Sequence, residues 1–138
     1  MKLFLDANIL VSVLNKEYPV FTYSSRILSL TENKKFEVFT SPICLAIAFY
    51  FSEKKSGNTV ARKKMELISN NLSITETNQL TVRKTARNKQ IHDFEVGLKY
   101  YSALQSNCKC IVTEDRNDFY FSEIEVLNSR DFLVKYVM

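Results

Sequence analysis

Short apolar runs alternate along the chain with longer segments in which apolar residues recur at helical spacing. The runs predict strands at residues 2–5, 36–39, 72–75, 108–113 and 124–127, the last at a sheet edge. The helical spacing and the capping residues around it predict the intervening helices. We expect these helices at residues 9–14, 19–33, 42–51, 59–70 and 129–137, with one more ending near residue 88, another beginning near residue 93, and a polar connection at residues 54–58.

This alternation of strands and helices is typical of an α/β protein. Parallel strands need helical crossovers, so we predict a three-layer α/β/α fold around a mostly parallel sheet. No linker, repeat or low-complexity tract interrupts the pattern, which favours a single domain at residues 1–138. The composition, 46% hydrophobic and 25% charged, is that of a globular domain. No signal peptide or membrane span is visible, so we expect a cytoplasmic protein without membrane contact.

Several classes of site are excluded by what the chain lacks. Only two glycines are present, too few for a phosphate-binding loop or a dinucleotide fingerprint. His92 is the only histidine, which leaves little for a catalytic triad or a zinc site. The three cysteines have no zinc spacing and are interpreted as buried thiols.

Aspartates follow the predicted strands at the positions where ligands bind in parallel sheets. Asp6 comes directly after the first strand, Asp115 and Asp118 follow the strand that ends at Thr113, and Asp93 opens a helix. Carboxylates gathered at one edge repel each other unless a cation neutralises them. Oxygen ligands alone favour Mg²⁺ or Mn²⁺ over zinc. Each aspartate also has a simpler interpretation as a turn or N-cap residue.

The net charge of +4 is distributed unevenly. Residues 54–89 carry nine basic and two acidic side chains, whereas residues 91–138 carry five basic and eight acidic ones. This arrangement suits a polyanion lying across a metal site, although solvated helix faces would give the same pattern. The candidate nucleic-acid-binding residues are Lys54, Lys55, Arg62, Lys63, Lys64, Arg83, Lys84, Arg87 and Lys89.

Four motifs resemble those of PIN domains, in the same order and over essentially the whole chain. They are FLDANIL at residues 4–10, DFE with YYSAL at 93–104, IVTEDRNDF at 111–119, and IEVL with RDFL at 124–133. The resemblance implies an α/β/α domain and, in active members, a Mg²⁺- or Mn²⁺-dependent ribonuclease. Many family members are toxins of toxin–antitoxin pairs, so it also implies RNA as substrate, a possible antitoxin partner and a homodimer.

The resemblance assigns roles to individual residues. Asp6 matches the first metal-binding carboxylate, and Asn8 matches the polar residue that supports its loop. Asp115 and Asp118 match the acidic positions of the IVTEDRNDF motif, and Thr113 matches a hydroxyl that bonds near the site.

Two positions depart from the family pattern. Ile47 stands where an acidic or amide residue is usual, and Val96 replaces the second acid of the third motif. Asp93, three residues before Val96, shares its helix face and is the better replacement, because Glu95 points about 100° away.

The leading hypothesis is a ribonuclease in which Asp6, Asp93 and Asp115 hold the metal, Asp118 assists, and Asn8, Thr113 and Glu95 support them. The apolar Ile47 and Val96 favour an alternative, a catalytically weakened module that binds RNA or a protein partner. A third class, phosphoryl transfer through an aspartyl-phosphate, also starts with a strand ending in Asp. It usually needs a second Asp where this chain has Asn8.

Overall fold

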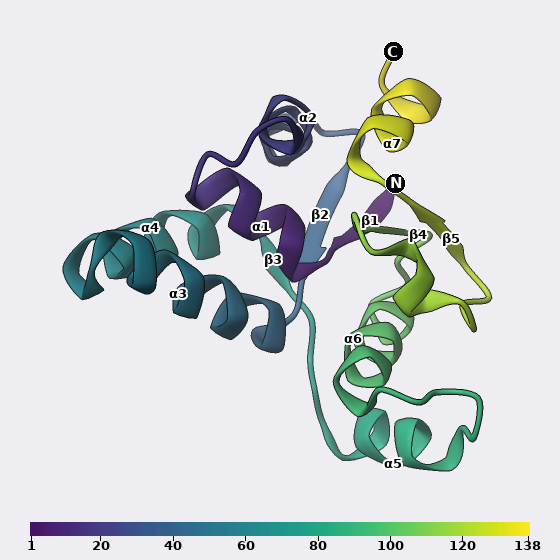
Figure 1. Cartoon of the computed structure of the whole chain (residues 1–138). Coiled ribbons are helices and arrows are strands. Elements are labelled where there is room, and N and C mark those ends of the chain that lie inside the picture. The colour runs from purple at the N-terminus through teal and green to yellow at the C-terminus, as the bar shows by residue number, and fades with distance from the viewer.

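The computed structural model describes residues 1–138 and is built on a five-stranded, wholly parallel sheet (Figure 1). In spatial order the strands are β3, β2, β1, β4 and β5. Leu3 of β1 pairs with Val38 of β2 on one side and with Cys110 of β4 on the other. The strands are β1 (Lys2–Leu5), β2 (Glu37–Thr40), β3 (Ser73–Ile74), β4 (Cys110–Val112) and β5 (Glu125–Leu127). The predicted parallel sheet, with the fifth strand at an edge, is confirmed.

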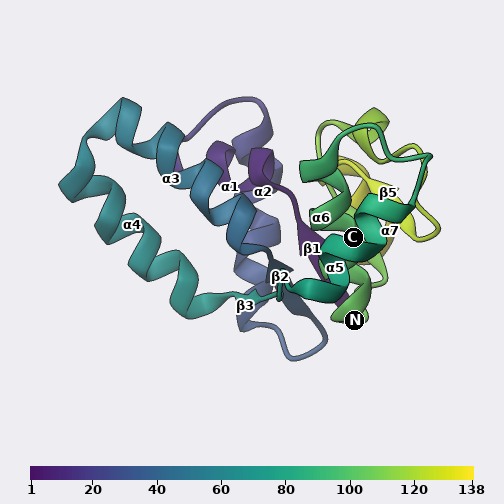
Figure 2. The ribbon, with the colours of Figure 1, turned by 90° about the horizontal axis from the view of Figure 1, so that it is seen from below.

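Helices flank the sheet on both sides, as the α/β/α prediction requires. In Figure 2, α1, α2 and α3 lie on one side of β1, and α5 and α6 lie on the other. The helices are α1 (Ala7–Leu14), α2 (Val20–Leu28), α3 (Pro42–Ser56), α4 (Asn58–Asn71), α5 (Gln79–Arg87), α6 (Phe94–Gln105) and α7 (Ser129–Tyr136). Two short 3-10 helices, η1 (Ser29–Glu32) and η2 (Arg116–Phe119), complete the chain.

The predicted polar connection at residues 54–58 is wrong. Helix α3 continues to Ser56, and α4 begins at Asn58. Gly57 alone separates them, with a φ of 85° that side chains rarely adopt. Lys54 and Lys55 lie in the last turn of α3, where positive charge is favourable, so they extend this helix rather than ending it.

The long helices form two projections from the sheet. Helices α3 and α4 pack against each other and extend to one side, whereas α5 packs against α6 on the other (Figure 2). The contact between α5 and α6 is close at Gly97, which is buried and lies against Thr85 and Ile91. These contacts fix the position of α6, the helix that brings Glu95 and Lys99 to the site described below.

The core is formed by β1 and its neighbours. Leu3, Phe4 and Leu5 are fully buried, and 25 buried residues form one hydrophobic cluster. All three cysteines are free and buried, which confirms the predicted thiols. No helix is long and apolar enough to cross a membrane.

Candidate functional site

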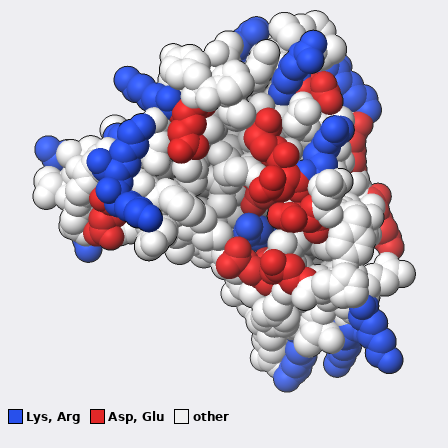
Figure 3. Space-filling view, viewed as in Figure 1, with Lys and Arg blue, Asp and Glu red and all other residues white.

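A pocket of about 390 Å³ opens at the carboxyl ends of β1 and β4. The chain passes from β1 to β2 on one side of the sheet and returns to β4 on the other. The crevice between β1 and β4 is therefore a topological switch point, where ligands bind in parallel sheets. The lining residues are Asp6, Ala7, Asn8, Val11, Glu17, Ile47, Phe51, Glu95, Lys99, Asp115 and Asp118. In Figure 3, acidic side chains surround a basic group near the middle of the face shown.

Asp6 lies at the bottom of this pocket and is 4% exposed. Its Oδ1 accepts hydrogen bonds from the Ala7 amide, at 2.8 Å, and lies 3.1 Å from the Lys99 ammonium. Its Oδ2 accepts a hydrogen bond from the Thr113 hydroxyl at 2.8 Å. Each carboxylate oxygen has two acceptor positions, and Oδ2 has no partner other than Thr113, so one of its positions is free.

Asn8 ties the loop after β4 to the start of α1. Its side-chain amide donates to Thr113 Oγ1 at 3.1 Å and to Asp115 Oδ2 at 3.3 Å. Its Oδ1 accepts from the backbone N–H of Glu114 at 3.2 Å. These contacts are what the supporting role predicted for Asn8 and Thr113 requires.

Asp115 and Asp118 also line the pocket. Unlike Asp6 and Glu95, neither of them has a cationic partner within ion-pair distance. Partial loss of hydration raises the pKa of Asp118, and the negative charges of Asp115 and Asp6 raise it further. The sequence prediction that strand-end aspartates meet at one pocket therefore holds for Asp6, Asp115 and Asp118.

Asp93 is not among the residues that line the pocket. It precedes α6, and its Oδ1 accepts from the Val96 amide at 3.2 Å, which makes it the N-cap of that helix. Glu95 lines the pocket directly, whereas the charge of Asp93 is still close enough to Asp118 to help raise the pKa of that carboxyl, so the assignment of Asp93 as a ligand stays a prediction. Glu95 reaches the pocket because of its face of α6: Val96 is buried in the core, and the pocket is reached from Glu95 and Lys99, four residues apart.

Lys99 is the residue of this site that sequence analysis missed. Its side chain is only 8% exposed, and its ammonium lies 3.1 Å from Asp6 Oδ1 and 3.6 Å from Glu95 Oε1. Burial alone lowers the pKa of Lys99, but the Asp6 carboxylate and other nearby groups leave the pKa above its ordinary value. The signal available in the sequence was the four-residue spacing of Glu95 and Lys99 in the N-terminal half of a helix, since this spacing places both side chains on one face.

The pocket offers oxygen donors that suit a hard divalent cation: the carboxylates of Asp6, Glu95, Asp115 and Asp118. Ile47 also lines the pocket and adds no ligand. No group of three or more acidic, histidine or cysteine side chains is gathered closely enough to enclose an ion as the side chains now stand. The carboxylate oxygens are suitable ligands for Mg²⁺ or Mn²⁺. The Lys99 ammonium is a positive charge within the same pocket and pairs with Asp6 and Glu95.

Cys44 lies behind Asp6, with its Sγ 3.8 Å from Oδ1. Burial raises the pKa of this thiol to about 11, and the Asp6 charge adds to the effect. Cys44 is therefore a neutral packing residue at pH 7, in agreement with the sequence interpretation.

Two of the nine predicted nucleic-acid-binding residues have another structural role. Lys64 donates to the carbonyl oxygen of Leu14 at 2.8 Å, and Lys55 donates to that of Asn15 at 2.5 Å. These carbonyls lie at the C-terminal end of α1, where four of them lack partners within the helix. Lys55 and Lys64 thus cap α1, and this use limits their availability to phosphates.

The other basic residues lie at two ends of the molecule. Arg62 donates to Asn58 Oδ1 at 3.0 Å on the exposed face of α4. Figure 3 shows basic side chains at both ends of the face that carries the acidic cluster, one over α3 and α4 and one over α5. The remaining members are exposed: Lys54, Lys63, Arg83, Lys84, Arg87 and Lys89.

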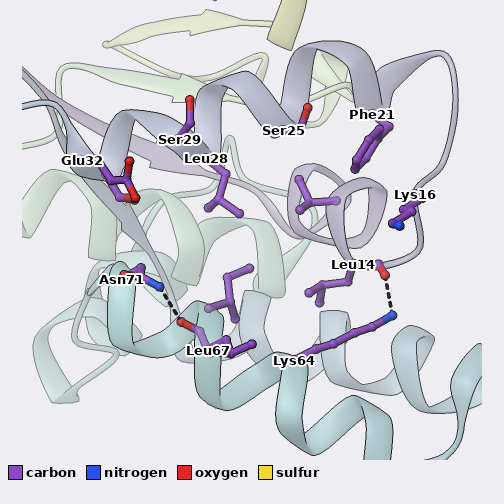
Figure 4. A pocket seen from close by; sticks show the side chains of 13 residues that line it. Leu14, Lys16, Phe21, Ser25, Leu28, Ser29, Glu32, Lys64, Leu67 and Asn71 are labelled. Atoms are coloured by element: carbon purple, nitrogen blue, oxygen red, sulfur yellow. Dashed lines mark hydrogen bonds between the residues drawn. The ribbon is translucent and has the colours of Figure 1, made fainter.

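A second hollow of about 500 Å³ lies between α1, α2, η1 and α4 (Figure 4). Leu14, Phe21, Leu28 and Leu67 contribute to its apolar lining, and Glu32 is its only carboxylate. A single carboxylate provides neither a metal site nor an acid–base pair. The acidic pocket is therefore the candidate for catalysis.

Comparisons with known proteins identify relatives of the sequence and of the fold. The sequence is 27% identical over 135 residues to a protein named ribonuclease VapC1 from Aquifex aeolicus, covering 95% of this chain and 92% of that one. The fold is similar to VapBC-1 of nontypeable Haemophilus influenzae, with a TM-score of 0.70, 15% identity, and coverage of 94% and 99% of the two chains. It is also similar to VapC20 of Mycobacterium tuberculosis, described as a sarcin–ricin loop cleaving toxin, with a TM-score of 0.66, 14% identity, and coverage of 89% and 98%.

The family match rests on the segment that carries the pocket. Residues 2–117 match the PIN domain family, a range that includes Asp6, Glu95, Lys99 and Asp115. The chain belongs to the PIN domain family.

Proposed function

We propose that this protein is an endoribonuclease that depends on a divalent metal ion and acts as the toxin of a toxin–antitoxin pair. The observation that carries the proposal is the pocket at the β1–β4 switch point, where Asp6, Glu95, Asp115 and Asp118 come together. The relative named as a ribonuclease and the neighbour described as an RNA-cleaving toxin support RNA as the substrate class.

Asp6, Asp115 and Asp118 are the residues that would hold Mg²⁺ or Mn²⁺, with Glu95 beside them. A bound divalent ion lowers the pKa of coordinated water and stabilises negative charge on a phosphodiester. Thr113 and Asn8 fix the carboxylates of Asp6 and Asp115 by direct hydrogen bonds. This proposal ranks Asp118 above Asp93 as a ligand, because Asp118 lines the pocket and Asp93 uses Oδ1 to cap α6.

The exposed basic residues at the two ends of the face would bind the flanking phosphates of a single strand. An acidic pocket repels RNA on its own, so attraction has to come from cations placed on both sides of it. Lys63 on α4 and Lys84 on α5 are exposed members of the two groups. RNA lying across the pocket would contact both ends at once.

A second function, binding without efficient cleavage, is favoured by one observation. Ile47 and the Lys99 ammonium occupy parts of the pocket where a carboxylate would help to hold an ion. In this case the same cleft would bind RNA or a protein partner while turnover would be slow. The experiment below separates the two functions.

The proposed partner is an antitoxin protein, and we further propose a homodimer and a cytoplasmic site of action on RNA. Support for the antitoxin comes from the VapBC neighbours, which are toxin–antitoxin complexes. Co-expression with a candidate antitoxin, followed by purification and mass measurement, tests both the complex and its stoichiometry.

The test of activity compares cleavage of a fluorescent RNA in Mn²⁺ by wild type, Asp118→Asn and Asp131→Asn. Asp131 is a matched control, because it pairs with Arg116 outside the pocket. We expect cleavage by wild type and Asp131→Asn, and a loss of about 100-fold or more in Asp118→Asn. Tight RNA binding by wild type with no cleavage in any variant would establish the second function instead.

A further inference from the structure

The Lys99 ammonium is the only cation inside the acidic pocket, and the fold holds it there. Lys99 lies in the middle of α6, and its neighbour Tyr100 is also buried, at 3% exposure. Gly97 packs against Thr85 of α5 without room for a side chain, so α6 approaches α5 closely. Helix α6 therefore directs the Lys99 side chain, which is 8% exposed, into the pocket.

Leaving the pocket would be unfavourable for this ammonium. Asp6 is 4% exposed, and a buried carboxylate without a counter-ion is strongly destabilising. Lys99 satisfies Asp6 Oδ1 at 3.1 Å and reaches Glu95 at 3.6 Å. Asp6 also receives the Ala7 amide on the same oxygen, which completes the two acceptor positions of Oδ1.

The two halves of the pocket thus differ in charge. Beside Lys99, the carboxylates of Asp6 and Glu95 have a cation. Beyond Oδ2 of Asp6, the carboxylates of Asp115 and Asp118 have none, and the hydrogen-bond donor nearest to Asp115 is the neutral Asn8 amide at 3.3 Å. Asp6 Oδ2 is linked to the loop of Asp115 through the Thr113 hydroxyl, which donates to Oδ2 and accepts from the Asp115 backbone N–H, and Oδ2 has no other hydrogen-bond partner.

We propose that Lys99 is a resident cation that permanently occupies one of the cation positions of this pocket, so that the protein binds a single divalent ion at Asp6 Oδ2, Asp115 and Asp118. The inference rests on the proposed metal-dependent function and specifies its site. Lys99 is a positioning residue: it holds Asp6 and Glu95 and repels a second ion, without touching the substrate.

The test is a count of bound Mn²⁺ by electron paramagnetic resonance, with calorimetry for the affinity, on metal-stripped protein. We expect one ion in wild type, and in Lys99→Gln either a second ion or binding that is tighter by about tenfold or more, because a repelling charge is gone. Lys64→Gln is the matched control: it removes a half-buried ammonium outside the pocket and should leave count and affinity unchanged.

Each other result overturns the inference. Wild type that binds no ion or two ions contradicts the single-ion site, and Lys99→Gln with wild-type count and affinity contradicts the role of Lys99. These counts do not require cleavage, so an inactive protein with one bound ion would overturn the proposed nuclease and leave the inference intact.

If Lys99→Gln does not fold, a measurement on wild type decides. The Nζ signal of Lys99 in ¹⁵N-lysine-labelled protein is followed during a Mg²⁺ titration and assigned by its loss in Lys99→Arg. We expect the signal to stay protected from exchange with water at saturating Mg²⁺. Loss of protection would show that the ion displaces the ammonium, which overturns the inference.

Discussion

The Thr113 hydroxyl donates a 2.8 Å hydrogen bond to Asp6 Oδ2 and so joins the carboxyl ends of two adjacent strands. The Thr113 Oγ1 also accepts hydrogen bonds, from the Asn8 side-chain amide at 3.1 Å and from the backbone N–H of Asp115 at 3.0 Å. A hydroxyl has one donor and two acceptor positions, so Thr113 uses all of them. It is fully buried and therefore fixes where Asp6 and the loop of Asp115 lie.

Replacing Thr113 by Val keeps the shape and removes every one of these bonds. Because Asp6 Oδ2 and two N–H groups lose their partner, we expect the free energy of unfolding to fall by about 1–3 kcal/mol. Urea unfolding followed by circular dichroism measures the change. Thr59→Val, at an exposed position of α4, is the control and should change stability by no more than about 0.5 kcal/mol. Equal stabilities for wild type and Thr113→Val would contradict the role given to this hydroxyl.

The sequence predicts the fold and part of the site because both depend on local patterns. Apolar runs such as residues 2–5 mark buried strands, and parallel strands bring their carboxyl ends to one edge. Asp6, Asp115 and Asp118 meet for this reason, although more than a hundred residues separate the first from the others.

The sequence does not predict side-chain contacts that depend on tertiary packing. The sequence allows Asp93 to be a metal ligand or the N-cap of a helix; the structure shows the cap, and a part in metal binding stays a prediction. Lys99 resembles a surface residue in the sequence, because nothing local shows that α6 turns it toward Asp6. Lys55 and Lys64 likewise meet the end of α1 only through the packing of α3 and α4.

The two adjacent lysines Lys63 and Lys64 should separate stability from RNA binding. Lys64 caps α1 through the Leu14 carbonyl, whereas Lys63 is exposed and makes no ion pair. We expect Lys64→Met to lower the free energy of unfolding by about 0.5–1.5 kcal/mol. Lys63→Met should leave stability unchanged and reduce the salt dependence of RNA binding, with the slope of log affinity against log salt falling by about 0.7. Fluorescence anisotropy at several salt concentrations and urea unfolding of both variants give the answer, and a reversed pattern would refute this division.

Gly97→Ala tests whether the packing of α5 positions α6. A Cβ at Gly97 would lie 2.4 Å from Thr85 Cγ2 and 3.0 Å from Ile91 Cγ2, both on branched side chains that cannot easily move. Overpacking typically costs about 1–3 kcal/mol, which outweighs the gain of about 1 kcal/mol from replacing glycine in a helix. We expect a lower unfolding midpoint in thermal denaturation. Gly97→Ala combined with Thr85→Ser, which removes the nearest methyl group, should recover part of the loss, and a failure to recover would locate the strain elsewhere.

Asp118→Asn should stabilise the metal-free protein at neutral pH. Folding raises the pKa of Asp118, through lost hydration and the charges of Asp115 and Asp6, so the folded state favours the protonated form. The stability that this group contributes is present at acid pH and is lost as the pH rises through the raised pKa. The amide that replaces this carboxyl stays uncharged at every pH, so in EDTA at pH 7 the Asp118→Asn variant should unfold at a higher temperature than wild type. This difference should vanish below about pH 3.8, the ordinary pKa of an aspartate, where Asp118 is protonated in both the folded and the unfolded protein.

Added Mn²⁺ should reverse this order. An ion that binds the native state raises the unfolding midpoint in proportion to its affinity, and Asp118→Asn has lost a ligand charge. Wild type should therefore gain more than the variant at millimolar Mn²⁺, with Asp131→Asn behaving as wild type in both conditions. Thermal scans with EDTA and with Mn²⁺ measure both halves of the prediction. A variant that is more stable than wild type in EDTA and gains as much from Mn²⁺ would place Asp118 in the electrostatics of the pocket but outside its metal site.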